Sequence, residues 1–503
     1  MKAKAFAAAS LTALLCGCAS LPDAPHPLAS LASTGTVSER FQSYNVEMVE
    51  VTGGRFWAPY GGPAGEVYRM RPPMDLADPK LVQLARHLGP AYIRVSGTWA
   101  NSTYLPAEGE RIGDPPDGYK QVLTRDQWRG VIGFANKIDG KIVTSFAVSP
   151  GTRDAEGVWR MDQAQRLIDL TREAGGSIAA AEFYNEPNAS MVGGLPQGYS
   201  AQDYARDFRI FEGWAREAAP DMALIGPGSV GEGAIEGVPV NALGGAILSK
   251  DMLSANPDRL DGFSYHFYGN VSQRCAKMRP TTAQKEEALT PEWLDLTLRD
   301  LAYYQRLRDA FEPGDPIWIT ETAQAACGGS PWASSFLDSF RYVNQLGLLA
   351  QRGVQVVMHN TLAASDYALL DDETYDPRPN YWAAVLWRQV MGRVVLDPPS
   401  VSGSDLRLYA HCLPSGGGGV GLAAINPGES AASVDIGGEG TAWVMQAEPL
   451  DSRNLTISGR SPAFDSHGML TGIEGISVKN SVSVPSRAIA FIAVPAAGNS
   501  ACN

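Results

Sequence analysis

The chain has 503 residues, of which 44% are hydrophobic, and carries a formal net charge of −13. This length predicts one large core with a smaller second unit rather than a single small domain. The acidic balance argues against nucleic acid as a partner.

The first residues have the features of an export signal. Two lysines precede a short apolar stretch (residues 5–15), and the letters LCGC (15–18) follow. The stretch is too short to span a bilayer. The four letters resemble a bacterial lipobox, in which Cys18 is lipidated, and ordinary cleavage nearby is the alternative. We expect a signal peptide over residues 1–18 of an exported bacterial protein, either a cell-envelope lipoprotein or secreted, which contacts a membrane only through this anchor.

Residues 19–35 are small, rich in proline and aperiodic. Such a composition is typical of a flexible linker. We therefore expect a tether with little order between the lipid anchor and the folded body.

Eight short apolar segments between residues 43 and 360 have the composition of strands. Segments with helical apolar spacing separate several of them, for example 78–88, 125–138, 161–174, 291–311 and 380–392. Strands that alternate with helices predict parallel βα units, and eight units fit a (β/α)8 barrel over residues 43–392. The expected strands are 43–51, 91–97, 141–148, 178–185, 223–228, 261–268, 316–321 and 354–360.

After residue 392 the pattern changes to period-two runs broken by Gly, Pro and Ser, such as 406–413, 419–426 and 488–495. This pattern is typical of an all-β module. The expected fold class is therefore α/β, a (β/α)8 TIM barrel with a C-terminal β-sandwich over residues 393–503. The segment 36–42, before the first barrel strand, could add a strand to the sandwich.

Two glutamates lie at the ends of the expected fourth and seventh strands. Glu186 follows an apolar run and stands between Asn185 and Pro187, and Glu321 ends the run PIWITE. Reacting groups project from this end of barrel strands, so the fold can bring the two carboxylates together. A separation of about 5 to 5.5 Å would match a retaining glycosidase, in which one carboxylate attacks the anomeric carbon and the other protonates the leaving oxygen. A loop or capping role for Glu186 is the alternative.

His266 and Tyr268 lie two residues apart at the end of the sixth strand, so they point to the same face. A single histidine in a strand is often structural. Beside two carboxylates at matching strand ends, however, this pair is interpreted as part of a substrate-binding site.

Four cysteines remain when Cys16 and Cys18 are assigned to the signal: Cys275, Cys327, Cys412 and Cys502. In an exported protein, four cysteines predict two disulfides. No C-x-x-C or H-x-x-x-H pair occurs, so we expect no metal site. We also expect no cofactor, since a mechanism based on two carboxylates requires none.

The sequence resembles the heparanase family (glycoside hydrolase family 79), retaining β-glucuronidases with a (β/α)8 barrel and a β-sandwich. The resemblance runs through most of the mature chain. The motifs NEPN (185–188) and TET (320–322) mark only the wider clan, whereas the region from IWITETAQAACGGSP to VQVVMHNTL (317–362) is more specific.

The resemblance implies roles for individual residues. Glu186 matches the acid/base and Glu321 the nucleophile, and Asn185 matches an asparagine that contacts the sugar. Further matches to positions at the substrate site are Glu47 on strand one, Thr98 after strand two, and the strand-six pair His266 and Tyr268.

Gly328 and Gly329 match the glycines whose backbone N–H groups hold the uronate carboxylate in this family. Oriented amides can bind an anion without a nearby arginine, and a flexible turn is the alternative. Tyr367 lies one place from the position of the family's tyrosine beyond strand eight.

The resemblance also bears on covalent structure. Cys412 and Cys502 match a disulfide of the family's sandwich, and we infer that Cys275 and Cys327, both just beyond barrel strands, form the other. Vertebrate members mature by excision of a linker, and no comparable basic linker is visible between residues 98 and 140. We therefore expect this chain to work uncut.

These implications predict a retaining glycoside hydrolase that cleaves β-glucuronic acid linkages, endo-acting on heparan sulfate-type glycosaminoglycan, and monomeric. The nearest alternative is an exo-β-glucuronidase that releases terminal glucuronic acid. A different specificity within the clan, such as arabinofuranosidase or xylosidase, and a lipoprotein that binds polysaccharide without cutting it are further alternatives.

Overall fold

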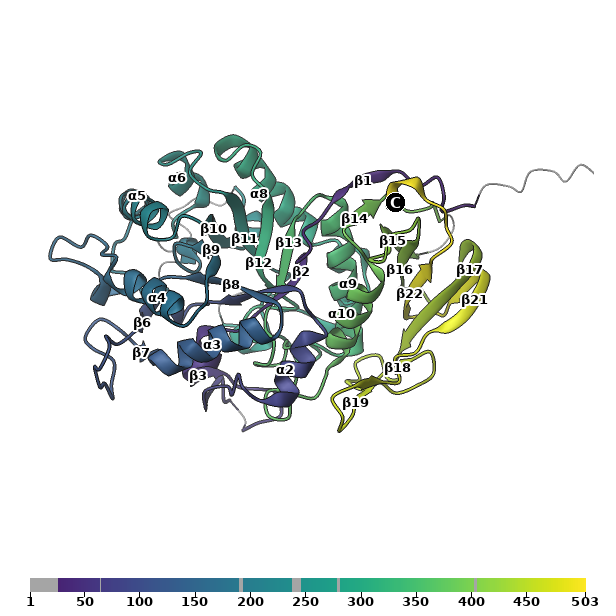
Figure 1. Cartoon of the computed structure of the whole chain (residues 1–503), viewed down its shortest axis with the longest axis horizontal. Helices are drawn as coiled ribbons and strands as arrows, with labels where there is room; N and C mark the ends of the chain where they lie inside the picture. Colours follow the sequence, from purple (N-terminus) through teal and green to yellow (C-terminus); the bar gives the residue numbers. More distant parts are fainter. Residues whose placement is uncertain (1–25, 64, 190–192, 238–245, 278–280, 402–404) are drawn as a thin grey trace, which may run out of the picture.

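The structure is a computed structural model that describes residues 26–503 apart from positions 64, 190–192, 238–245, 278–280 and 402–404 (Figure 1). The expected signal peptide, with Cys18, lies outside the described residues. Within the described part, every helix is too short or too polar to cross a lipid bilayer.

Eight parallel strands close into a barrel, each paired with the next one along the chain, and the eighth pairs with the first. The predicted (β/α)8 fold is therefore confirmed. The barrel strands are β2 (Gln42–Asn45), β5 (Ala91–Val95), β8 (Gly140–Ser145), β9 (Ile178–Glu182), β10 (Ala223–Val230), β11 (Gly262–Tyr268), β12 (Ile317–Ala323) and β13 (Val356–His359).

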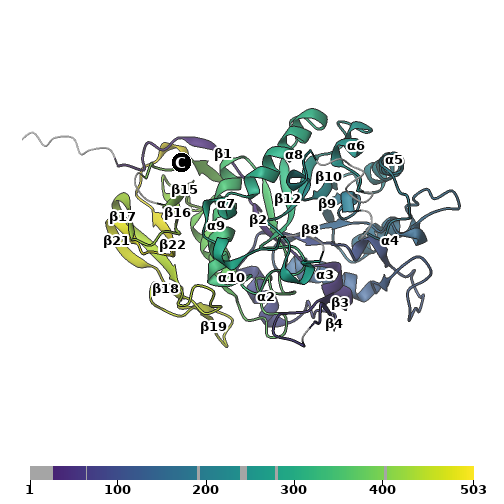
Figure 2. The same ribbon diagram turned by 180° about the vertical axis from the view of Figure 1, so that it is seen from behind.

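Helices surround the barrel (Figures 1 and 2). Several begin where a polar side chain satisfies the free N–H groups of the first turn. Asp78 accepts a hydrogen bond from the Leu81 N–H, and Thr124 and Gln127 form a capping box. The main helices are α2 (Pro79–Arg86), α3 (Arg125–Lys137), α4 (Asp162–Glu173), α5 (Ala201–Ala218), α6 (Ser249–Ser254), α8 (Thr297–Phe311), α9 (Phe336–Gln351) and α10 (Pro379–Val390).

Two elements differ from the expectation. The expected strand 43–51 ends at Asn45, and α1 (Met48–Thr52) follows, with the Glu50 side chain accepting a hydrogen bond from the Glu47 N–H at its start. The expected helix 291–311 divides into α7 (Pro291–Leu294) and α8.

Seven strands of the C-terminal residues and one N-terminal strand form an antiparallel sheet of eight strands that packs against α9 and α10 (Figures 1 and 2). Tyr409 and Phe491 belong to the core shared with the barrel, whereas Leu422 belongs to a separate core of the sheet itself. Val434 of β17 and Val482 of β21 join that second core. The strands are β1 (Ser33–Thr36), β14 (Val394–Leu396), β15 (Arg407–Cys412), β16 (Val420–Asn426), β17 (Ala432–Gln446), β18 (Thr456–Ile457), β21 (Ile476–Val484) and β22 (Ala488–Val494).

The residues from His26 to Gly35, expected to belong to a tether, are ordered against this sheet. Leu28 is fully buried in the core of the sheet, and the side chain of Asn499 donates hydrogen bonds to the carbonyls of Leu28 and Leu31. Strand β1 pairs with β14. The added strand is thus residues 33–36 rather than 36–42, because a buried leucine and backbone pairing hold the segment in place.

Three short strand pairs complete the fold: β3 (Gly54–Trp57) with β4 (Tyr68–Arg71), β6 (Thr103–Tyr104) with β7 (Gln121–Val122), and β19 (Ala463–Phe464) with β20 (Leu470–Thr471). The β3–β4 hairpin follows the first barrel strand. The backbone N–H of Tyr60, between its two strands, donates to Asp366 in the loop after β13, which fixes the hairpin beside the barrel mouth.

Candidate active site

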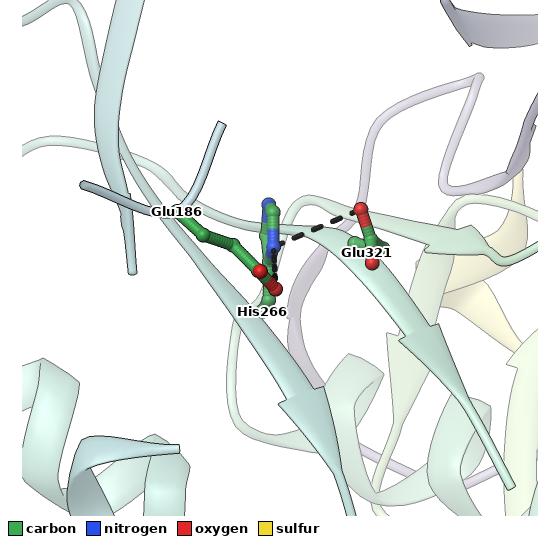
Figure 3. Close-up of side chains that lie close together, drawn as sticks. All are labelled: Glu186, His266 and Glu321. Atoms are coloured by element: carbon green, nitrogen blue, oxygen red, sulfur yellow. Dashed lines mark hydrogen bonds and ion pairs between the residues drawn. The ribbon is translucent and has the colours of Figure 1, made fainter. Parts of the chain in front are cut away.

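Glu186 and Glu321 converge at the C-terminal end of the barrel. Glu186 lies in the loop after β9 and Glu321 lies in β12, and both side chains point toward His266 of β11 (Figure 3). One carboxylate oxygen of Glu186 and one of Glu321 are within 4.8 Å of each other. Glu186 has a positive φ of 51°, a conformation that is uncommon for residues other than glycine and that is found at functional sites.

His266 is fully buried between the two carboxylates. Its Nδ1 lies 3.2 Å from Oε1 of Glu186 and 3.8 Å from Oε2 of Glu321. Burial alone would lower the pKa of the imidazole, but the negative charge of Glu321, followed by the nearby carboxylates of Glu182 and Glu186, raises it to about 9. The ring is therefore positively charged at neutral pH, and its Nδ1 lies between the carboxylates of Glu186 and Glu321.

Arg94 of β5 is the centre of the site, and the sequence analysis did not single it out. The buried guanidinium donates from Nη1 to Glu321 (2.9 Å) and from Nη2 to Glu182 (2.8 Å) and Asn185 (2.8 Å). Burial by itself would lower the pKa of Arg94, but the carboxylates of Glu182 and Glu321 raise it above its usual value. The arginine stays charged and fixes three site residues at once.

Glu182, the last residue of β9, is a buried partner of Arg94 that was also not predicted. Its second oxygen accepts hydrogen bonds from Ser264 (2.8 Å) and Thr320 (2.5 Å). Burial would raise its pKa, but Arg94, followed by His266, holds the pKa below its usual range. Glu182 is therefore an ionised carboxylate that balances the charge of Arg94.

Tyr268, Tyr367 and Glu47 meet around Asn360, another residue that was not predicted. The Nδ2 of Asn360 lies 3.0 Å from the Tyr268 hydroxyl, 3.1 Å from the Tyr367 hydroxyl and 3.2 Å from Oε1 of Glu47. Tyr268 in turn donates to Oε1 of Glu321 (2.5 Å). These contacts bring the three residues that the family resemblance proposed for substrate binding to the site of Glu321.

Burial, followed by the nearby negative charge of Glu321, raises the pKa of Glu47 well above its usual range. This shift favours the protonated form of the Glu47 carboxyl group. Its Oε2 is buried and has no hydrogen-bond partner within the described residues. A side-chain carbon on Gly97 would lie 1.6 Å from this oxygen, so glycine is required there for Glu47 to occupy its position.

A cavity of about 570 Å³ adjoins the two glutamates. On the β3–β4 hairpin, the rings of Trp57 and Tyr68 stack with 4.5 Å between their centres, and the Arg55 guanidinium lies 4.8 Å from the centre of the Tyr68 ring. Thr98, which the resemblance placed near the substrate, belongs to the lining. The lining residues are Glu47, Arg55, Trp57, Tyr68, Thr98, Trp99, Lys120, Glu186, Gly193, Gly194, Tyr268, Glu321, Ala326, Cys327 and Tyr367.

The turn of Gly328 and Gly329 lies directly behind the cavity wall and is tightly packed. A side-chain carbon on Gly328 would lie 2.7 Å from Cβ of Trp57, and both glycines have φ near 80°. The N–H of Gly329 donates to the carbonyl of Ala325 (3.2 Å), so this amide is already engaged. Of the two amides that the resemblance assigned to carboxylate binding, the N–H of Gly328 alone forms no hydrogen bond within the described residues.

Two disulfides are present, with the pairing that was inferred from the resemblance. Cys275 pairs with Cys327, and Cys412 pairs with Cys502. The first joins the segment after β11 to the loop after β12, and Cys327 itself lines the cavity. The second ties β15 to the C-terminus.

In the described part of the chain, the group of carboxylate and imidazole ligand atoms with spacing for a metal ion is that of Glu186, His266 and Glu321. Glu321 already accepts a hydrogen bond from Arg94, whose Nη2 lies 3.2 Å from Nε2 of His266. The guanidinium thus supplies the positive charge that a metal would bring to the same atoms.

The raised pKa of His266 predicts a loss of stability at alkaline pH. A histidine whose pKa rises from 6.5 to about 9 on folding stabilises the fold below pH 6.5, and this contribution is lost as the pH rises through 9. Between pH 7 and pH 9.5, we expect the difference in free energy of unfolding between the wild type and His266→Gln to shrink by about 2 kcal/mol. Urea unfolding at the two pH values measures it.

The matched control is His411→Gln. Burial lowers the pKa of His411 to about 4, so its imidazole stays neutral over this pH range and the corresponding difference should be flat. A flat difference for His266→Gln as well would mean that His266 is neutral and accepts a hydrogen bond from Arg94.

Comparison of the sequence finds relatives among heparanases, although no family model matches the chain. Heparanase of Mus musculus is 26% identical over 391 residues, which cover 67% of this chain and 68% of that protein. Heparanase-like protein 1 of Arabidopsis thaliana is 24% identical over 405 residues (77% of this chain, 71% of that protein). Baicalin-β-D-glucuronidase of Scutellaria baicalensis is 26% identical over 349 residues (66% and 61%).

Solved structures share the fold at low sequence identity. A 4-O-α-L-rhamnosyl-β-D-glucuronidase from Fusarium oxysporum has a TM-score of 0.62 at 12% identity and covers 94% of this chain and 99% of its own. An arabinofuranosidase from Xanthomonas axonopodis pv. citri has a TM-score of 0.61 at 15% identity (92% and 97%). Over about two thirds of its length, the chain is thus similar in sequence to heparanases and to a β-glucuronidase, and it shares its fold with solved glycosidases.

Proposed function

We propose that the chain is a retaining β-glucuronidase that cuts within heparan sulfate-type polysaccharide. The observation that carries the proposal is the separation of the two glutamates, whose nearest ligand oxygens lie within 4.8 Å beside a cavity. A retaining enzyme needs about 5 to 5.5 Å between its carboxyl groups, and an inverting enzyme needs room for a water molecule between them. The names of the relatives support a glucuronide as the substrate.

In this proposal Glu321 is the nucleophile. Its two oxygens accept hydrogen bonds from Arg94 and Tyr268, which stabilise the ionised form and direct it toward the substrate. The carboxylate attacks the anomeric carbon, and the bond to the leaving oxygen breaks as a glycosyl-enzyme ester forms. Water then attacks the same carbon and releases Glu321, so the sugar keeps its configuration.

Glu186 is the general acid and base. It is more exposed than Glu321, with 16% of its side chain accessible against 8%, and it is held by His266 through a single oxygen. The other oxygen can therefore reach the leaving group. In the first step Glu186 gives its proton to the leaving oxygen, and in the second it takes a proton from the attacking water.

The charges at the cavity support an anionic polymer as the substrate. Arg55 and Lys120 line it, and within the described residues neither forms an ion pair. They can attract the acidic groups of neighbouring sugar units in spite of the negative charge of the whole chain. The two disulfides further support export, because such bonds persist in oxidising compartments.

Digestion of a defined heparan sulfate oligosaccharide tests this function. We expect internal fragments, with the β-configuration of the new reducing end observed by NMR during the first minutes. Free glucuronic acid as the sole product would replace endo-action by exo-action. Absence of hydrolysis of both this oligosaccharide and aryl β-glucuronides would reject the function itself.

Removal of Glu186 should have an effect that depends on the leaving group. For Glu186→Ala, we expect kcat/KM to fall by about 10²- to 10⁴-fold on an oligosaccharide, whose alcohol leaving group needs a proton. The loss should be smaller on 4-nitrophenyl β-glucuronide, whose leaving group departs as a stable anion. Steady-state kinetics on both substrates measure the difference.

Azide provides the accompanying control. In Glu186→Ala it can enter the space of the missing carboxylate, attack the glycosyl-enzyme and give a β-glucuronosyl azide. Equal losses on the two substrates, without azide product, would contradict the acid/base role of Glu186.

A further inference from the structure

A buried arginine lies behind the turn of Gly328 and Gly329. Arg274 follows β11, next to the disulfide-bonded Cys275, and only 4% of its side chain is exposed. Its Nη1 donates hydrogen bonds to the carbonyls of Cys327 (3.1 Å) and Gly329 (2.6 Å). The guanidinium therefore holds both ends of the turn, including the residue that lines the cavity.

Arg274 shares one carboxylate with a second arginine. Its Nη2 donates to Asp366, which also accepts a hydrogen bond from Nη2 of Arg453 (3.1 Å) in the C-terminal part of the chain. Asp366 thus carries one negative charge between two positively charged arginines. The three side chains together have a net charge of about +1. Nε of Arg274 is buried and without a hydrogen-bond partner in the described part of the chain.

The position of this charge matters for the substrate. A side-chain carbon on Gly328 would lie 3.0 Å from Nη1 of Arg274, and Nη1 donates to the carbonyls of both neighbours of Gly328, so the guanidinium packs directly against this residue. Charges that are shielded from water interact more strongly than exposed ones. An anionic group that approaches the Gly328 N–H would therefore be attracted by Arg274 as well as by the amide dipole.

We infer that Arg274 is a specificity-determining residue that favours substrates with a carboxylate over neutral sugars. The inference rests on the proposed function, in which that carboxylate belongs to the glucuronic acid unit. Arg274 acts through the turn of Gly328 and Gly329, which it positions and whose electrostatic potential it makes positive. A role limited to bracing the loop would affect charged and neutral substrates equally.

Kinetics on a charged and a neutral substrate test the inference. For Arg274→Met we expect kcat/KM for 4-nitrophenyl β-glucuronide to fall about 10- to 100-fold, mainly through KM, because the buried positive charge that attracts the carboxylate through the turn is removed. For 4-nitrophenyl β-glucoside, kcat/KM should change by less than about 2-fold. If the glucoside rate is too low to measure, inhibition constants for glucuronate and glucuronamide provide the same comparison.

Two further variants complete the test. Arg453→Met removes the other arginine partner of Asp366 and one positive charge of the group without touching the turn, so it should lower the charged-to-neutral ratio less than Arg274→Met does. Arg274→Lys keeps the charge and should retain part of the preference if Arg274→Met does not fold. Parallel losses on both substrates, or an unchanged ratio in Arg274→Met and Arg274→Lys, would overturn the inference. Failure of the wild type on every glucuronide would instead overturn the proposed function.

Discussion

Replacing Glu321 with Gln is expected to lower kcat for 4-nitrophenyl β-glucuronide by about 10⁴-fold or more. The amide has nearly the shape of the carboxylate but cannot form the glycosyl-enzyme ester. Arg94 and Tyr268, which donate to the two oxygens of Glu321, would then face a neutral group. The loss should therefore appear in kcat, while the cavity and the fold remain.

Glu47→Gln is the matched control for this experiment. Glu47 is a buried glutamate of the same cavity, and burial and the charge of Glu321 raise its pKa, so an amide is a close substitute for its protonated form. We expect it to lose no more than about 10-fold, the cost of one altered hydrogen bond. In Glu321→Ala, azide should yield an α-glucuronosyl azide, the opposite configuration from the product of Glu186→Ala. Retention of more than a hundredth of the activity in Glu321→Gln would remove Glu321 from the nucleophile role.

The barrel could be predicted from the sequence because its strands are short apolar runs separated by amphipathic helices. This regular alternation also places strand ends at one mouth of the barrel, so the position of Glu186 and Glu321 at the ends of two such runs implied that they meet. Neither step needed knowledge of a contact between distant residues. The structure adds the distance, which the sequence could not supply.

The partners of the two glutamates were harder to predict. Arg94 stands in an apolar run between Ile93 and Val95, which pack in the core around the barrel, and its own side chain points to the interior. A charged residue at an inward position of a barrel strand was the available signal. For Asn360 no local signal exists, because its role arises from contacts with Glu47, Tyr268 and Tyr367 on three other segments.

Backbone hydrogen bonds explain the remaining differences. The hydrogen bond from the Gly329 N–H to the Ala325 carbonyl depends on the backbone conformation of the turn, and a Gly-Gly pair can adopt many conformations. Likewise, β21 (Ile476–Val484) was not predicted, because most of its side chains are polar and exposed and its place is set by pairing with β17. The pattern of hydrophobic residues therefore does not predict such a strand.

Arg94→Met is expected to reduce the free energy of unfolding by about 3–5 kcal/mol, the usual cost of leaving a buried charge without its partner. In the wild type the guanidinium faces Glu182 and Glu321, both buried. Without it, Glu182 keeps neutral donors and the charged His266, but Glu321 loses the hydrogen bond that stabilises its ionised form. Urea unfolding measures the stability. We also expect a lower kcat for Arg94→Met under conditions in which the variant is folded.

Arg153→Met separates the two effects. Arg153 forms another buried ion pair, with Asp207 at 2.7 Å, but it is not among the residues that line the cavity. We expect a comparable loss of stability with kcat largely unchanged below the unfolding transition. If both variants lost stability but neither lost activity, Arg94 would be a structural residue of the barrel. If Arg94→Met alone lost activity, the buried arginine would be part of what makes Glu321 reactive, since it directs the same carboxylate that must attack the sugar.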